Sequence, residues 1–390
     1  MVAPFQPDPE QVAAIRAALP ATGAGIFLDT ATAGPLPVEG LKAMRELLAY
    51  EERVGRADVD SAEAFEERAG ETRAVLATLL AADPDAFTLV PGTTTAIAWA
   101  AAAAPARAGQ RVVTTDHEHP AVAAVLEGAA ARAGLAVRQV ALDADDTTLV
   151  ARFAAAVDEA TCLLVVSHVT WDTGRVLPVA DLVALARRSS GAVTVIDGAQ
   201  AVGAIATDVP AIGPDVYAVS GYKWLLGPHG VGAVWRSARA TALGPLPASA
   251  LHRPSVVGLG RSVGWLEMYV GLPWALARAA TLTATVRQAL GAIEGVELLT
   301  GGGLSSPLVA FRIRGWPAET ARAALARRVF AVCAALPHQD AIRISVGWFN
   351  TASELARFAG AVAELAAATP ATLPERPRLV VLPAEPGGPS

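Results

Sequence analysis

Short apolar runs alternate with longer stretches of helical spacing along the first 236 residues of the chain. The runs are bounded by glycine, proline or polar residues, so they predict strands. Between most of them, apolar and alanine-rich positions repeat at the interval that predicts helices. The alternation predicts an α/β domain with a mostly parallel sheet, whose functional groups should lie at the carboxyl ends of the strands. The predicted strands are residues 26–28, 87–90, 111–115, 136–140, 162–167, 193–196, 216–219 and 232–235.

The pattern changes after Arg236. Proline and glycine interrupt residues 244–260, a long helical pattern covers about residues 265–291, and short strands are predicted near 296–299 and 308–313. We interpret this part as a smaller α+β domain. The predicted division is residues 20–245 for the large domain, residues 1–19 and 246–367 for the small domain, and residues 368–390 for a proline-rich tail that is expected to be disordered.

Composition and charge exclude several classes of function. With 390 residues, 53% of them hydrophobic, the chain can bury a large core. A net charge of -6 without a basic run argues against binding to nucleic acid or to an anionic membrane surface. The only cysteines, Cys162 and Cys333, lie outside any metal-binding spacing, which argues against a disulfide framework or a zinc site. The chain starts without a secretion signal and has no apolar segment long enough to cross a membrane, so we expect a soluble cytoplasmic protein.

Lysine is rare in this chain: Lys42 and Lys223 are the only two. Lys42 lies in a predicted amphipathic helix, whereas Lys223 lies between an apolar strand and a glycine-rich turn. Arginine stays protonated at ordinary pH, but a desolvated lysine can lose its proton and bond to a carbonyl carbon. Lys223 is therefore a candidate to carry an aldehyde cofactor. The alternative is that a coding bias depleted lysine everywhere and left two by chance.

Polar groups follow two of the predicted strands. Thr93 and Thr94 stand in a glycine and threonine turn between strand 87–90 and a helix, a position that suits either a bound phosphate or an ordinary threonine N-cap. Asp197 follows strand 193–196, where burial raises a carboxyl pKa unless a cation pairs with it. A protonated pyridine nitrogen would be such a cation, and a helix cap is the alternative.

Histidine and arginine side chains supply further candidates. His117, Glu118 and His119 form a possible metal cluster, but no third ligand is placed by the sequence, and one imidazole stacked on an aromatic cofactor is the simpler interpretation. His168 is expected to be structural. Arg343 alternates with apolar residues on a predicted strand, where it would either clamp a carboxylate or form a structural ion pair.

Together these motifs resemble those of the class V aminotransferase and cysteine desulfurase family of fold-type-I pyridoxal-phosphate (PLP) enzymes, over about residues 25–365. The resemblance rests on the sequence Ser-Gly-Tyr-Lys at 220–223, followed by Gly-Pro and a glycine-rich strand entry at 227–232, and on the polar residues above. It implies a seven-stranded sheet domain and a PLP cofactor that Lys223 holds covalently. The residues that match the family's cofactor site are Thr93, Thr94, His119, Asp197, Gln200, Ser220, Tyr222 and Lys223.

The resemblance also implies a role for each group. Asp197 would keep the pyridine nitrogen protonated, Gln200 would contact the phenolic oxygen, and His119 would stack on the ring. Thr93, Thr94 and Ser220 would bind the phosphate. Arg343 would bind the carboxylate of an amino-acid substrate, and Lys223 would move its Cα proton. The family forms homodimers, in which we expect Arg261 or Ser262 to approach the neighbouring cofactor.

Departures from the family guide the choice of reaction. Desulfurases carry a cysteine on a mobile loop before the carboxylate-binding arginine, but here Cys333 lies in an apolar segment that predicts a buried strand. Trp171 stands where desulfurases usually have an asparagine, so it should shape the substrate pocket. These features favour a C–S lyase that releases pyruvate and ammonia from a cysteine-derived amino acid. The alternatives are an epimerase or aminotransferase, then a cysteine desulfurase, and last a non-catalytic binding protein.

Overall fold

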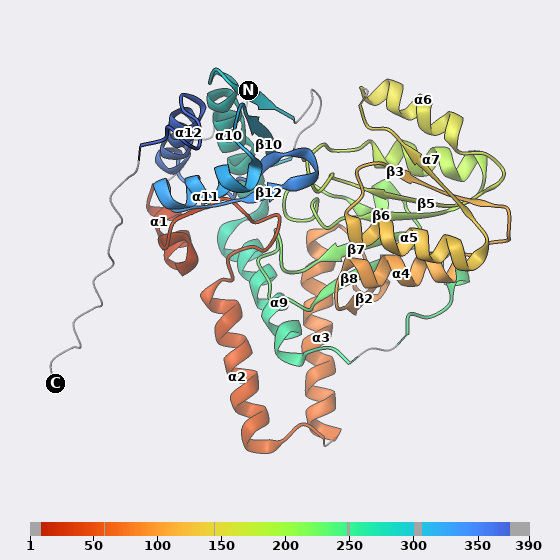
Figure 1. Cartoon of the computed structure of the whole chain (residues 1–390). Helices are drawn as coiled ribbons and strands as arrows, with labels where there is room; N and C mark the ends of the chain where they lie inside the picture. Colours follow the sequence, from red (N-terminus) through yellow and green to blue (C-terminus); the bar gives the residue numbers. More distant parts are fainter. Residues whose placement is uncertain (1–8, 58, 144, 248–249, 300–305, 375–390) are drawn as a thin grey trace, which may run out of the picture.

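The protein is described by a computed structural model that covers residues 9–57, 59–143, 145–247, 250–299 and 306–374. Figure 1 shows two α/β units side by side, with helices α2 and α3 projecting away from both. The helices are α1 (Pro9–Ala17), α2 (Val38–Val54), α3 (Val59–Leu79), α4 (Thr93–Ala103), α5 (Pro120–Ala133), α6 (Asp146–Ala156), α7 (Val179–Ser189), α8 (Val209–Ile212), α9 (Arg253–Trp265), α10 (Leu272–Gly291), α11 (Ala318–Val329) and α12 (Ala352–Ala366).

The strands follow the alternation that the sequence predicts. They are β1 (Ile26–Phe27), β2 (Phe87–Val90), β3 (Arg111–Thr115), β4 (Ala136–Val140), β5 (Thr161–Ser167), β6 (Val193–Asp197), β7 (Val216–Ser220), β8 (Gly232–Arg236), β9 (Val296–Leu298), β10 (Leu308–Ile313), β11 (Ala331–Val332), β12 (Ala334–Leu336) and β13 (Ala341–Ser345).

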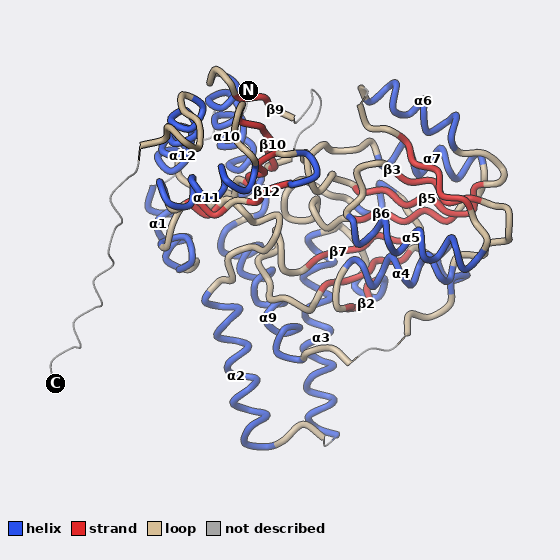
Figure 2. Tube along the Cα trace, in the orientation of Figure 1, coloured by secondary structure: helices blue, strands red, loops and turns tan. Residues whose placement is uncertain are grey.

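A seven-stranded sheet forms the larger unit, in the order β2-β8-β7-β6-β5-β3-β4. Strand β8 runs antiparallel to both of its neighbours, and the remaining pairs are parallel. Apolar side chains cover both faces of this sheet, which explains why its strands are continuous apolar runs. Helices α6 and α7 pack on one face, and α4 and α5 on the other (Figure 2). The predicted α/β class with a mostly parallel sheet is confirmed.

A second core lies around the antiparallel sheet β12-β13-β10-β9, which packs against α10, α11 and α12. Strand β1 belongs to this core although it comes early in the chain, because it pairs with β11, in the register Ile26 to Ala331. An isolated bridge then joins Asp29 to Ser345, at the end of β13. The chain immediately after β1 therefore lies beside the strand that carries Arg343.

Helix α9 corrects the prediction for residues 244–260, which we expected to be irregular. The helix begins at Arg253, because Pro254 stands in the first turn, where a missing N–H costs no intrahelical hydrogen bond. Its glycines are needed for close packing: a Cβ at Gly258 would lie 2.7 Å from Met44 of α2, and one at Gly260 would lie 2.5 Å from Thr72 of α3. The glycines that indicated an irregular segment in the sequence instead form a surface on which helices pack closely.

The long helix predicted at 265–291 is likewise interrupted. A π-helical turn, η4 (Leu266–Val270), follows α9, and Gly271 with a φ of 83° separates it from α10. That left-handed conformation suits glycine and ends the helix. None of the described helices is long and apolar enough to span a membrane.

Candidate active site

Lys223 lies just beyond the carboxyl end of β7, in a cavity that also opens at the ends of β5 and β6. Most of its side chain is enclosed, and this burial lowers the pKa of the ammonium to about 8, while the negative charge of Asp197 partly opposes the shift. Lys223 forms no ion pair with any described residue. Its amine can therefore be neutral, and so nucleophilic, near physiological pH. The cavity is lined by Thr93, Thr94, His119, Val122, Ser167, Val169, Trp171, Asp197, Ala199, Gln200, Tyr222 and Lys223.

Asp197 is the last residue of β6, beside the end of β7, and its side chain is buried. Burial raises the pKa of its carboxyl, while a hydrogen bond from the Ala199 amide (2.9 Å) and the charge of Lys223 oppose that rise. A buried carboxylate gains stability from a nearby cation. Asp197 therefore suits the protonated nitrogen of a pyridine ring.

The first turn of α4 and the end of β7 come close together, in an arrangement that suits an anion. Gly92 caps α4, and neither Thr93 nor Thr94 caps it with a side chain, so the N-cap alternative for these threonines is not what the structure has. Ser220 lies opposite Gly232 in the sheet, and Gly232 packs close to Gly92. The Oγ of Ser220 is buried without a hydrogen-bond partner among the described residues. Free helix N–H groups and an unpaired hydroxyl are what a phosphate needs.

The side chains of residues 117–119 point in three different directions, so they do not converge on one metal ion. His117 Nδ1 lies 2.7 Å from Asp172 Oδ2, and this contact is the main reason that the pKa of His117 is raised. His119 lines the cavity. No set of three possible metal ligands occurs together in the described part of the chain.

His119 is suited to lie against a ring. Its Nδ1 accepts a hydrogen bond from the Ala121 amide (3.2 Å), so a neutral ring carries its proton on Nε2. Burial, and then the positive charges of Lys223 and Arg343, lower its pKa. Its ring meets Trp171 edge to face, with centroids 5.1 Å apart.

Glu118 is a site residue that the sequence interpretation missed, since it was considered only as a metal ligand. It is buried, and it accepts hydrogen bonds from the Oγ of Ser167 (2.6 Å), the amide of Ser167 (3.0 Å) and the Oγ1 of Thr115 (2.7 Å). Burial raises its pKa to about 7. Glu118 thereby fixes Ser167, a residue of the cavity wall. The neighbouring His168 is structural, as expected: burial lowers its pKa to about 4, and its Nδ1 lies 2.9 Å from the Tyr217 hydroxyl.

Gln200 and Tyr222 lie in the cavity wall and contact other protein groups. Gln200 donates to the Ala31 carbonyl (2.9 Å), and its Oε1 accepts from the indole N–H of Trp224 (2.9 Å). Tyr222 packs on His229, with ring centroids 4.5 Å apart. The predicted contact of Gln200 with a phenolic oxygen would have to use the second N–H of its amide.

Arg343 lies on β13 and is almost fully enclosed. Its Nη1 donates to the Trp171 carbonyl (2.7 Å), and its Nη2 donates to Thr32 Oγ1 (2.7 Å) and to Asp29 Oδ1 (3.1 Å). The sequence left open whether Arg343 clamps a ligand carboxylate or forms a structural ion pair, and the structure shows an ion pair with Asp29. Asp29 and Thr32 are further residues that sequence reasoning missed. The only signal was that Asp29 directly follows a predicted strand.

Trp171 lines the cavity next to Arg343. Its indole stacks on His338, with centroids 5.3 Å apart, and Gln339 donates to Asp172 Oδ2 (2.5 Å). The short segment before Arg343 is thus attached to the larger unit. Cys333 is buried behind it, and burial raises the pKa of its thiol to about 12. A thiol with so high a pKa stays protonated near neutral pH, which makes it a weak nucleophile.

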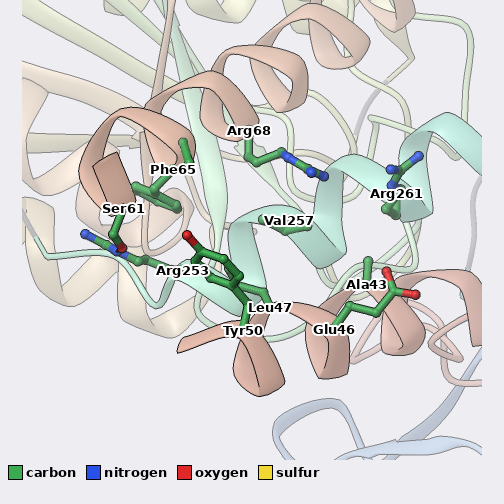
Figure 3. A pocket seen from close by; sticks show the side chains of 11 residues that line it. Ala43, Glu46, Leu47, Tyr50, Ser61, Phe65, Arg68, Arg253, Val257 and Arg261 are labelled. Atoms are coloured by element: carbon green, nitrogen blue, oxygen red, sulfur yellow. The ribbon is translucent and has the colours of Figure 1, made fainter. Parts of the chain in front are cut away.

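A second cavity lies between α2, α3 and α9 (Figure 3), and Lys223 is not among the residues that line it. Arg261 lines it from α9, together with Arg68 of α3 and Glu46 of α2. Ser262 is completely buried within α9, so the expectation that it could contact a neighbouring subunit is wrong. Of the pair Arg261 and Ser262, only the arginine is exposed.

Comparison with known proteins agrees with this geometry. A family model described as aminotransferase class-V matches residues 26–250. Isopenicillin N epimerase of Streptomyces clavuligerus is 31% identical over 334 residues, which cover 75% of this chain and 83% of that protein. Cysteine desulfurase of Salmonella typhimurium is 33% identical over 171 residues, 44% of this chain and 39% of that protein.

Solved structures share the fold. A mutant of C-DES with glycine covalently linked to its PLP cofactor has a TM-score of 0.84 at 21% identity, covering 92% of this chain and 99% of that one. The cysteine desulfurase CsdA of Escherichia coli has a TM-score of 0.80 at 24% identity, covering 90% and 97%. The match of the family model over more than half of the chain establishes the family. The chain belongs to the class V aminotransferase family and is a PLP-dependent enzyme with the fold-type-I architecture.

Proposed function

We propose that the protein is a lyase that cleaves the C–S bond of a cysteine-derived amino acid by β-elimination. The observation that carries this proposal is that Lys223 is the cavity group whose pKa, about 8, suits proton transfer near neutral pH. The pKa of His119 is lowered and that of Tyr222 is raised. β-Elimination needs one base at Cα, and we assign that role to Lys223, which lines the same cavity as Asp197 and Trp171.

The residues divide the work as follows. PLP, when bound, supplies an electron sink that stabilises negative charge at Cα. Lys223 removes the Cα proton and can return it to the departing sulfur. Arg343 holds the substrate carboxylate by charge-assisted hydrogen bonds, which fixes the orientation of the Cα–H bond. Trp171 borders the space for the substrate side chain. Loss of the thiol leaves 2-aminoacrylate, whose imine form takes up one water from solvent and breaks down to pyruvate and ammonia.

The buried thiol of Cys333 argues against persulfide transfer, because a protonated cysteine is a poor nucleophile. C-DES, described as a cystine C–S lyase, shares the fold at 21% identity, which supports the architecture but does not select the reaction. Epimerisation is the second candidate, because isopenicillin N epimerase matches three quarters of the chain. It would require a proton donor on the face of the substrate opposite Lys223, and an aminotransferase would instead require proton return to the cofactor.

The test is to incubate the purified holoenzyme with a panel of cysteine S-conjugates and their sulfoxides, and to measure pyruvate and ammonia. Pyruvate from the wild type but not from Lys223→Ala supports β-elimination. Recovery of the opposite enantiomer without pyruvate, in deuterated water with label at Cα, would instead establish epimerisation.

We also propose that two copies of the chain associate through the surface formed by α2, α3 and η4. Several large apolar side chains are exposed there, among them Met268 at 90% and Val59 at 70%. An interface at this surface would remove these apolar side chains from water. Light scattering should give twice the mass of the chain, and Met268→Glu should lower that value.

A cytoplasmic location stays a prediction, supported by the two unpaired cysteines.

A further inference from the structure

The arginine that we assign to the substrate carboxylate already holds a carboxylate. Asp29 contacts Nη2 of Arg343 at 3.1 Å, and the two side chains are 16% and 4% exposed. The bridge from Asp29 to Ser345 fixes the backbone on both sides of this contact. The ion pair is therefore part of the site, and not a surface contact that solvent would weaken.

The hydrogen bonds of the guanidinium show what this contact prevents. Nη2 has two hydrogens, and Thr32 and Asp29 accept them both. A carboxylate that binds an arginine bidentately uses either the Nε and Nη2 pair or the Nη1 and Nη2 pair. Both pairs include Nη2. Nε itself is buried without a partner among the described residues. In the Nε and Nη2 pair, Nε is therefore free to bind a carboxylate while Nη2 is occupied.

We propose that Asp29 is a specificity-determining residue that occupies Arg343 Nη2 until the carboxylate of an incoming amino acid displaces it. This inference rests on the function proposed above. The exchange replaces one carboxylate by another, so a ligand with only a carboxylate gains little. An amino acid also brings an ammonium, which the released Asp29 can attract. Asp29 lies close enough to Lys223, the place of the incoming amine, for its charge to act on that lysine.

The proposed ligand class is therefore amino acids with a free ammonium, in preference to plain carboxylates of the same size. Asp29 would discriminate between them by charge, although it forms no part of the proton transfer. Sequence spacing could not reveal this, because Asp29 and Arg343 are brought together by the pairing of β1 with β11.

The test measures the Kd of propionate and of L-alanine for the holoenzyme, in the wild type and in Asp29→Asn. We expect the variant to bind propionate about tenfold more tightly, the scale typical of coupling between two ligands of one protein. L-alanine should gain about threefold or less, because it loses the attraction of Asp29 for its ammonium. Asp29→Ser serves as a second variant with the same expectation, and the cofactor absorbance band checks that each variant is loaded.

Asp172→Asn is the matched control. Asp172 acts on Arg343 by charge, but its carboxylate contacts His117 and Gln339 instead of Nη2. Similar tightening in Asp172→Asn and Asp29→Asn would overturn the proposal, since charge alone would then explain both. Weaker or unchanged propionate binding in Asp29→Asn would also overturn it, because Asp29 would then only orient the arginine. Neither ligand has a leaving group, so a lack of lyase activity would refute the proposed reaction without touching this result.

Discussion

The two ends of the cavity are built in different ways. At the cofactor end, Asp197, Ser220 and Lys223 come from two adjacent strands of one sheet and the turn after them, and they leave charges and a hydroxyl without full partners. At the substrate end, Arg343 meets Asp29 and Trp171 from distant parts of the chain, and its charge is already paired.

This difference matches a cofactor that stays bound at one end and a substrate that exchanges at the other. A cofactor that stays bound can supply the missing partners once, so the protein can leave the Ser220 hydroxyl without a hydrogen bond and the Asp197 carboxylate without an ion pair among the described residues. A substrate arrives and leaves in every cycle, and a buried arginine without a counter-charge would be costly each time the site empties. The pairing of Arg343 with Asp29 avoids that cost. The following changes test this contrast.

Lys223→Ala should have the largest effect. The loss of both the covalent attachment point and the Cα base should lower kcat by at least about 10⁴-fold. Lys42→Ala is the matched control, because Lys42 is an exposed residue of α2 and should leave kcat unchanged. Activity measured beside thermal unfolding would check this, and substantial turnover by Lys223→Ala would contradict the assignment.

Arg343→Ala should be the most damaging change at the substrate end. Removal of a charge-assisted pair and exposure of the Asp29 carboxylate should cost about 3 kcal/mol of binding, or about 150-fold in kcat/KM. The effect should appear mainly in KM. The variant should also unfold more easily, since Asp29 is then a partly buried carboxylate without its partner. An unchanged KM would mean that the substrate carboxylate binds elsewhere.

The pH dependence of cofactor attachment tests the cofactor end. Because burial lowers the pKa of Lys223 to about 8, its reactive neutral amine predominates only above that pH. The rate at which the cofactor-free protein takes up PLP should therefore rise about tenfold from pH 7 to pH 9 and then level off. In Asp197→Asn the midpoint should move to lower pH, because the Asp197 charge favours the protonated lysine. A midpoint above pH 10 in stopped-flow absorbance would refute this environment for Lys223.

Ser220→Ala should have the smallest effect and the most specific one. Since its hydroxyl has no hydrogen-bond partner in the part of the chain that the structure describes, removing it should leave the unfolding of the cofactor-free protein unchanged. The Kd for PLP should rise about fivefold, from the loss of about 1 kcal/mol of hydrogen bonding. Ser345→Ala is the contrast. The Ser345 hydroxyl accepts a hydrogen bond from the Ala31 amide and donates one to the Leu28 carbonyl, so its removal should lower the stability of the cofactor-free protein. Equal effects of both changes on the cofactor-free protein would contradict the distinction.

The sequence predicted which residues meet around Lys223 but not which residues meet Arg343, for a physical reason. Lys223, Asp197 and Thr93 each lie at or just beyond the carboxyl end of a strand of one mostly parallel sheet, so the rule that strand ends converge places them together. Arg343 and Asp29 meet only because β1, which precedes the seven-stranded sheet in the chain, pairs with β11, and no local pattern encodes that pairing. Helix α9 was misread for a similar reason, since its glycines serve contacts with other helices.

One measurement tests the central claim, that Lys223 is the amine which the cofactor end presents to PLP. The holoenzyme would be reduced with borohydride, digested, and the labelled peptide identified by mass spectrometry. Since Lys42 and Lys223 are the only lysines, the peptide map distinguishes them without ambiguity. We predict one label per chain, on Lys223. Label on Lys42, on the N-terminal amine, or on no amine at all would contradict the account.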